Sequence, residues 1–79
     1  MQVRVRLLGT LSSCYRGQYP PAGIDIQVPA DATVAGVVEA AGIPRERVAI
    51  VTVNGLLAKA DDRVPEHAVV KFMQPITGG

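Results

Sequence analysis

Residues 48–59 read Val48-Ala49-Ile50-Val51-Thr52-Val53-Asn54-Gly55-Leu56-Leu57-Ala58-Lys59 and predict a β-hairpin. The first six of these residues form a nearly continuous apolar run with three valines, which indicates a strand covered over most of its length. Asn54 and Gly55 both tolerate the positive φ angles that a two-residue type I′ turn requires. The last four residues are the return strand, in which Leu56 is expected to point inward and Leu57 outward.

Three further strands are predicted outside this hairpin. Residues 2–8 alternate, so that two arginines and Leu8 lie on the face opposite the inward valines. Residues 24–28 alternate in the same way and are followed by a proline. Residues 69–73 form the last strand, and Met73 is expected to face solvent because it follows an inward phenylalanine.

One amphipathic helix is predicted between the second strand and the hairpin. Apolar residues recur there at i, i+3, i+4 and i+7, namely at Val34, Val37, Val38 and Ala41. Either Thr33 or Asp31 can cap the start of the helix. Gly42 is expected to end it in a left-handed conformation, with Ile43 packing back and Pro44 preventing continuation.

The predicted order is strand, strand, helix, strand, short strand, strand, which indicates a two-layer α+β domain. A mixed sheet of four to five strands packed on one helix, with the last strand beside the first, is the β-grasp arrangement. At this length, residues 1–79 are expected to form a single domain, with residues 74–79 as a flexible C-terminal diglycine tail. Residues 9–23 contain three glycines and a proline pair and predict a long loop.

Composition narrows the possible functions. Eight basic and seven acidic residues are interspersed, with a formal net charge of +1, which argues against nucleic-acid binding. The single Cys14 cannot form an internal disulfide, nor a tetrahedral zinc site with the single His67. No apolar run approaches the roughly 18 residues of a membrane span, and the N-terminus lacks the apolar core of a signal peptide. A soluble protein of a reducing, cytoplasmic compartment is therefore expected.

The sequence ends in Met73-Gln74-Pro75-Ile76-Thr77-Gly78-Gly79. Two glycines in succession can enter a channel too narrow for any other residue. The α-carboxyl group has a reference pKa of about 3.3–3.7 and is an anionic oxygen nucleophile at neutral pH. An enzyme could therefore present this carboxylate to the α-phosphate of ATP and form an acyl-adenylate. The alternative is that Gly78 and Gly79 are simply a frayed end.

Three segments together resemble the MoaD and ThiS proteins, the sulfur-carrier branch of the ubiquitin-like superfamily. They are Pro29-Ala30-Asp31-Ala32-Thr33-Val34, Val51-Thr52-Val53-Asn54-Gly55 and Val70-Lys71-Phe72-Met73-Gln74-Pro75-Ile76-Thr77-Gly78-Gly79. The resemblance covers essentially the whole chain. Two segments depart from the family pattern: the turn Pro65-Glu66-His67-Ala68 and the loop 9–23.

The resemblance implies a carrier rather than an enzyme. An ATP-dependent adenylating protein related to ubiquitin-activating enzymes would act on Gly79, with Gly78 letting the tail through. A sulfur donor would then convert the adenylate to a thiocarboxylate. The chain itself would bind no cofactor, because ATP is used by the partner.

The ending Pro75-Ile76-Thr77-Gly78-Gly79 favours the small subunit of a molybdopterin or tungstopterin synthase, which would make the large subunit of that enzyme a partner. The alternatives are a carrier for thiamin synthesis that serves thiazole synthase, a protein modifier conjugated to target lysines through Gly79, and a β-grasp binding module without terminal chemistry.

Partner binding is assigned to three outward apolar residues and to the tail. Leu8, Leu57 and Met73 are each expected to face solvent near a strand end, where they could form one patch beside the tail. In the related carriers these positions match apolar residues of the docking surface, and the tail residues Pro75, Ile76 and Thr77 would enter the partner. Scattered exposed apolar residues are the alternative interpretation.

The other residue types that could carry chemistry have simpler interpretations. Cys14 is expected to be an ordinary loop cysteine and His67 a solvated turn residue. Asp61 and Asp62 are expected to act as local caps rather than metal ligands. The two lysines, at positions 59 and 71, are expected to be solvated strand residues, so the sequence predicts no metal site.

Overall fold

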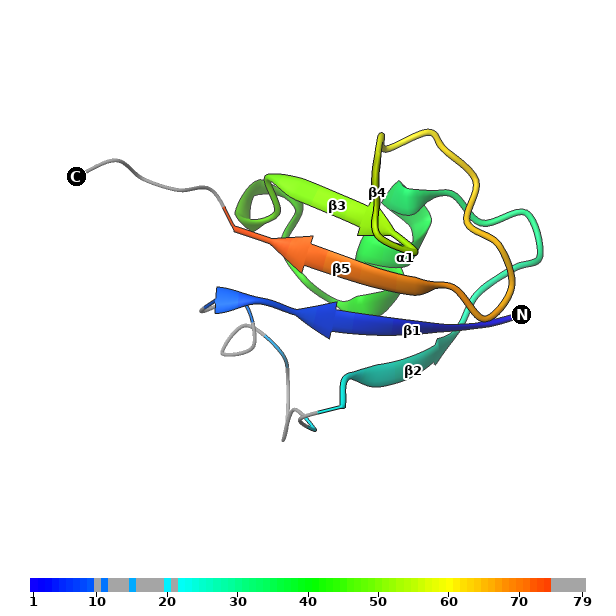
Figure 1. The fold of residues 1–79 in the computed structure, drawn as a ribbon, viewed down its shortest axis with the longest axis horizontal. Coiled ribbons are helices and arrows are strands. Elements are labelled where there is room, and N and C mark those ends of the chain that lie inside the picture. Colours follow the sequence, from blue (N-terminus) through cyan, green and yellow to red (C-terminus); the bar gives the residue numbers. More distant parts are fainter. Residues whose placement is uncertain (10, 12–14, 16–19, 21, 75–79) are drawn as a thin grey trace.

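The computed structural model describes residues 1–9, 11, 15, 20 and 22–74. Within these residues the chain forms five strands and one α-helix in the predicted order: β1 (Gln2–Leu7), β2 (Ile24–Gln27), α1 (Val34–Ala41), β3 (Ile50–Val53), β4 (Leu56–Ala58) and β5 (Val69–Met73). The sequence did not predict the short 3₁₀ turn η2 (Arg45–Arg47), which lies between α1 and β3. Figure 1 shows the helix packed across one face of the sheet.

The strands form one mixed sheet in the order β2-β1-β5-β3-β4. The central strands β1 and β5 are parallel, with Val5 opposite Val70 and Leu7 opposite Phe72. The remaining neighbours are antiparallel. The last strand therefore lies beside the first, as Figure 1 shows, and the predicted β-grasp fold is confirmed.

Helix α1 begins and ends at the predicted residues. Of the two candidate caps it is Thr33 whose hydroxyl oxygen accepts a hydrogen bond from the Gly36 amide at 3.3 Å. Gly42 follows the helix with φ 75°, in the left-handed region, and its amide donates to the Glu39 carbonyl. Ile43 is buried, so it packs back onto the core as expected.

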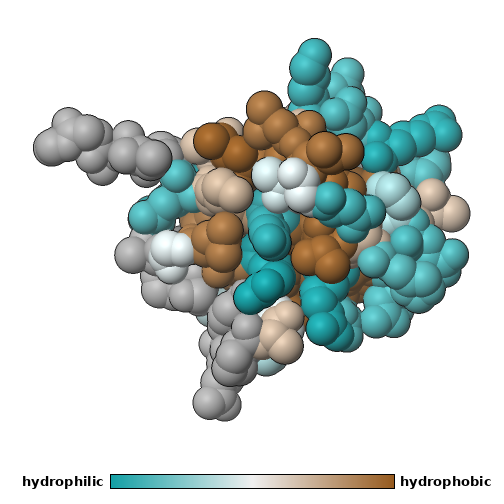
Figure 2. Space-filling view, viewed as in Figure 1, coloured by the Kyte–Doolittle hydropathy of each residue, from teal (hydrophilic) through white to brown (hydrophobic). Residues whose placement is uncertain are grey.

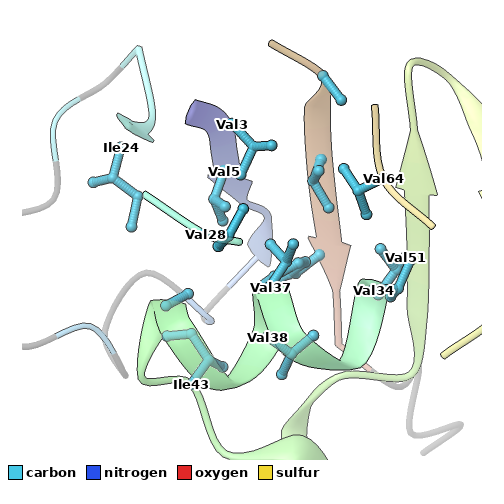
Figure 3. Packing of buried hydrophobic residues seen from close by; sticks show 14 of the residues in the cluster. Val3, Val5, Ile24, Val28, Val34, Val37, Val38, Ile43, Val51 and Val64 are labelled. Carbon is cyan, nitrogen blue, oxygen red and sulfur yellow. The ribbon is translucent and has the colours of Figure 1, made fainter. Parts of the chain in front are cut away.

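The core lies between α1 and the sheet and is almost entirely aliphatic. Figure 3 shows Val37 of the helix facing the inward side chains of the strands, and Val38 is buried as well. Phe72 is completely buried and is the aromatic residue of this cluster. No polar side chain is buried in the described part of the chain. Leu11 is only 1% exposed, a core contact that the sequence did not predict because its neighbours have no strand or helix periodicity.

The hairpin turn is confirmed, and Leu56 lies on the inner face as predicted but is not buried. Asn54 has φ 52° and Gly55 has φ 85°, as a type I′ turn requires. Leu56 pairs with Val53, which is opposite the buried Val70, yet Leu56 is 74% exposed. It lies next to the turn on a three-residue edge strand, whereas the start of the helix contacts the other end of this hairpin, where the Ala35 amide donates to the Ala60 carbonyl. Leu56 therefore faces the inner side of the sheet beyond the reach of the helix.

The strand predicted over residues 48–53 is shorter and more open than expected. β3 begins at Ile50, and of its four residues only Val51 is buried. The helix covers one face of the sheet only, so alternate residues of β3 face solvent.

The described residues include no helix with the length and apolar character of a membrane span.

Candidate functional site

Backbone hydrogen bonds hold the chain on both sides where β5 ends. The Leu8 amide donates to the Phe72 carbonyl at 3.0 Å, and the Ala49 amide donates to the Met73 carbonyl at 2.8 Å. Gln74 follows, and its side chain lies so close to Gly9 that a Cβ on that glycine would be 3.2 Å away. Residues 75–79 therefore follow a part of the chain that is hydrogen-bonded to Leu8 on one side and to Ala49 on the other.

Three apolar side chains gather beside this point on the face of the sheet opposite α1. Ile50 and Met73 are cross-strand partners, and the register of β1 with β5 continues so that Leu8 lies on the other side of Met73. Ile50 is 42% exposed, and the other two side chains are half-buried. These three, here called the apolar patch, line a shallow depression together with Gly9, Ala49 and Gln74.

Leu57 faces the same side of the sheet from the edge strand and is 76% exposed. It pairs with Thr52, which places it diagonally from Ile50 at a typical spacing of roughly 7–8 Å. The structure therefore places Leu8 and Met73 side by side. Leu57 is not their direct neighbour; Ile50 lies between Leu57 and Met73. Sequence reasoning missed Ile50, although strict alternation within β3 would have placed it outward with Thr52.

A cationic row crosses the same face next to the apolar patch. Arg6 of β1 lies directly opposite Lys71 of β5. Figure 2 shows this face, with a hydrophilic stripe between hydrophobic groups. The next arginine along β1, Arg4, binds Asp25 of β2 through two hydrogen bonds of 2.9 and 3.2 Å.

This ion pair is the main electrostatic interaction on the open face. The hydrogen bond from Arg4 lowers the pKa of the Asp25 carboxyl below its ordinary value. The same bond raises the pKa of the Arg4 guanidinium. Because the pair is exposed to solvent, it contributes little to stability but neutralises both of its members locally.

The residues set aside as candidates for chemistry have local roles where they are described. One Asp62 carboxylate oxygen accepts a hydrogen bond from the Lys59 amide at 2.9 Å, as expected for a turn cap. His67 is exposed, and its Nε2 lies 3.6 Å from a Glu66 carboxylate oxygen. In the part of the chain that the structure describes, no cluster of three or more His, Cys, Asp or Glu residues could hold a metal ion.

Residues 75–79 of the predicted tail and Cys14 lie outside the described residues, whereas Gln74, the first residue of that tail, lies against Gly9. The predictions for the tail therefore stay predictions; they concern Pro75, Ile76, Thr77, Gly78 and Gly79.

Comparison with known proteins gives one family and one fold. The model of the ThiS family matches residues 5–79. No curated protein matches the chain significantly. Among solved structures, the crystal structure of SAMP1 from Haloferax volcanii superposes with a TM-score of 0.74 at 17% sequence identity, covering 100% of both chains. The structural match supports the ubiquitin-like β-grasp fold, and the family match extends through the apolar patch to the diglycine.

Proposed function

Because the chain belongs to the ThiS family, whose members are small carrier proteins rather than enzymes, we propose that it carries sulfur as a thiocarboxylate on Gly79. The observation that carries this proposal is the family match over residues 5–79, which includes Gly78 and Gly79. The geometry supports it, because the chain leaves the sheet toward these glycines at the apolar patch.

The proposed chemistry takes place on a partner enzyme. A carboxylate oxygen of Gly79 attacks the α-phosphate of ATP, and pyrophosphate leaves to give the acyl-adenylate. A hydrosulfide-type nucleophile from the sulfur donor then attacks the carbonyl carbon, and AMP leaves with the bonding electrons. Most of the rate gain comes from positioning the reacting groups.

The folded part of the chain provides the surface that binds the partner, and residues 75–79 provide the length to reach its active site. Residues 75–79 span at most about 17 Å when extended, at roughly 3.3–3.6 Å per residue. The apolar patch can therefore rest on the surface of an adenylating enzyme related to ubiquitin-activating enzymes while Gly79 enters its active site. In this proposal the carrier binds no cofactor, the partner binds the ATP, and both proteins are cytoplasmic.

For the destination of the sulfur, we favour molybdopterin synthesis, with this chain as the small subunit of molybdopterin synthase. The supporting observation is the ending Pro75-Ile76-Thr77-Gly78-Gly79, which resembles MoaD tails. The second candidate is thiamin thiazole synthesis, and the match to the ThiS family model is consistent with both pathways. Conjugation of Gly79 to lysines of target proteins is the remaining alternative.

Intact-mass analysis tests the proposal. The protein is incubated with ATP, a sulfur donor and the adenylating enzyme of its own organism. Replacement of one oxygen by sulfur at Gly79 would support the carrier function, whereas higher-mass adducts with other proteins would support the modifier. An unchanged mass with an active enzyme would rule out both. Return of the thiocarboxylate to a carboxylate in the presence of the large subunit of molybdopterin synthase and its substrate, and not with thiazole synthase and its substrates, would assign the pathway.

A further inference from the structure

Arg6 and Lys71 place two positive charges side by side on the open face of the sheet. They are direct cross-strand partners on β1 and β5. Like charges in this position repel each other and destabilise a sheet. Within residues 1–9, 11, 15, 20 and 22–74, neither cation forms an ion pair, and the nearest acid on the face, Asp25, is already bound to Arg4.

The stems of both side chains lie against neighbouring residues of the sheet. Lys71 is half-buried, and its neighbours along β5 on this face are Val69 and Met73. The stem of Arg6 packs over Gly23, where a Cβ would come within 3.0 Å of the Arg6 Cγ. The two side chains therefore start from neighbouring positions beside the apolar patch, and neither has an acidic partner among the described residues.

We propose that Arg6 and Lys71 together bind a carboxylate side chain of the partner protein that covers the apolar patch. This inference rests on the proposed function, because it takes that partner to be the adenylating enzyme. The docking surface of the adenylating enzyme should carry apolar residues that contact Leu8, Ile50 and Met73. An acidic residue should lie at the edge of that apolar surface, opposite Arg6 and Lys71. A carboxylate between the two cations would remove their repulsion in the complex only.

A second copy of this chain is a poor occupant of the same face. An isologous dimer with its two-fold axis near this pair would bring Arg6 and Lys71 of both copies together and add to the repulsion. Nucleic acid fits poorly as well, because hydrophobic groups flank the hydrophilic stripe on the face that Figure 2 shows. An acidic and apolar protein surface complements both features.

The substitution Lys71→Glu tests the proposal through two opposite effects. In the free protein it converts the repulsive pair into an ion pair with Arg6, so Tm should rise. In the complex it places a carboxylate against the partner's carboxylate, so affinity for the adenylating enzyme, measured by calorimetry, should fall by about tenfold or more. The matched control is Arg63→Glu, which makes the same charge change in the bridge beside the start of α1.

Each outcome has a definite meaning. A higher Tm with weaker binding, and a control that binds like the wild type, supports the proposal. Unchanged affinity of Lys71→Glu, an equal loss in the control, or a lower Tm overturns it, while adenylation of the wild type leaves the carrier function standing. If the wild type is not adenylated by an active enzyme, the carrier function fails and this inference fails with it.

Discussion

Ile50 and Met73 face each other across β3 and β5, one residue away from the hydrogen bond in which the Ala49 amide holds the Met73 carbonyl at 2.8 Å. Met73 thus contributes its side chain to the apolar patch and its backbone carbonyl to the hydrogen bond beside the start of the tail. A protein that docks on the patch therefore meets the chain next to Gln74, the point from which residues 75–79 continue, and this helps to position Gly79.

Met73→Asp should weaken binding to the adenylating enzyme by about tenfold or more, because it places a charge in the centre of the proposed contact. The Met73 side chain is half-buried and lies on the open face, so the fold should persist. Calorimetric affinity and the rate of pyrophosphate release measure the effect. Ile50→Asp should give the same loss.

The control for both substitutions is Leu56→Asp. Leu56 is 74% exposed but lies beside the hairpin turn, away from the patch. If Leu56→Asp weakened binding as much as Met73→Asp, the apolar patch would not be the docking surface.

Two glycines of the helix region should respond to alanine with opposite signs. Gly42 has φ 75°, and a Cβ there would contact nothing within 4 Å, so Gly42→Ala should cost about 1 kcal/mol through backbone strain alone. Gly36 lies within α1, where a Cβ would approach only the Thr33 hydroxyl at 3.7 Å. Gly36→Ala should therefore stabilise by roughly 0.5–1 kcal/mol. Urea unfolding of the two variants measures both; a stabilising Gly42→Ala would contradict the left-handed end of the helix.

The ion pair between Arg4 and Asp25 should make a small contribution to stability that disappears in acid. Arg4 holds the folded-state pKa of Asp25 below the ordinary value of 3.8. The contribution is therefore fully present above pH 3.8 and is lost as the pH falls through the lower folded-state pKa. Asp25→Asn should lower Tm slightly at neutral pH, and this difference should shrink as the pH falls below 3.8. A Tm difference that grew toward low pH would contradict this assignment.

The order of elements and the limits of the helix could be predicted because their signals are local. The Thr33 hydroxyl caps the start of α1. Gly42 ends the helix because a residue without a Cβ adopts the left-handed conformation easily. The turn at Asn54 and Gly55 is likewise determined by the φ angles that these two residues tolerate.

The errors lie where burial depends on distant parts of the chain. Leu56 and Ile50 are apolar residues of the predicted hairpin, yet both are exposed, because the helix covers only one face and does not extend to the turn. Leu11 is buried without any periodic pattern around it. The opposition of Arg6 and Lys71 follows from the parallel register of β1 and β5, which periodicity within either strand cannot give.

Removal of Gly79 should abolish thiocarboxylate formation and leave stability unchanged. The core cluster of the described chain ends at Phe72, so truncation after residue 78 should not alter Tm by more than the measurement error. Gly79→Ala is the sharper variant, because it keeps the length and the terminal carboxylate but adds a Cβ to a residue that must pass a narrow channel. Intact mass after incubation with ATP, sulfur donor and adenylating enzyme reports the product for each protein. A thiocarboxylate on the truncated chain would show that Gly79 is not the modified residue, and a rate for Gly79→Ala equal to that of the wild type would show that the channel does not select for glycine.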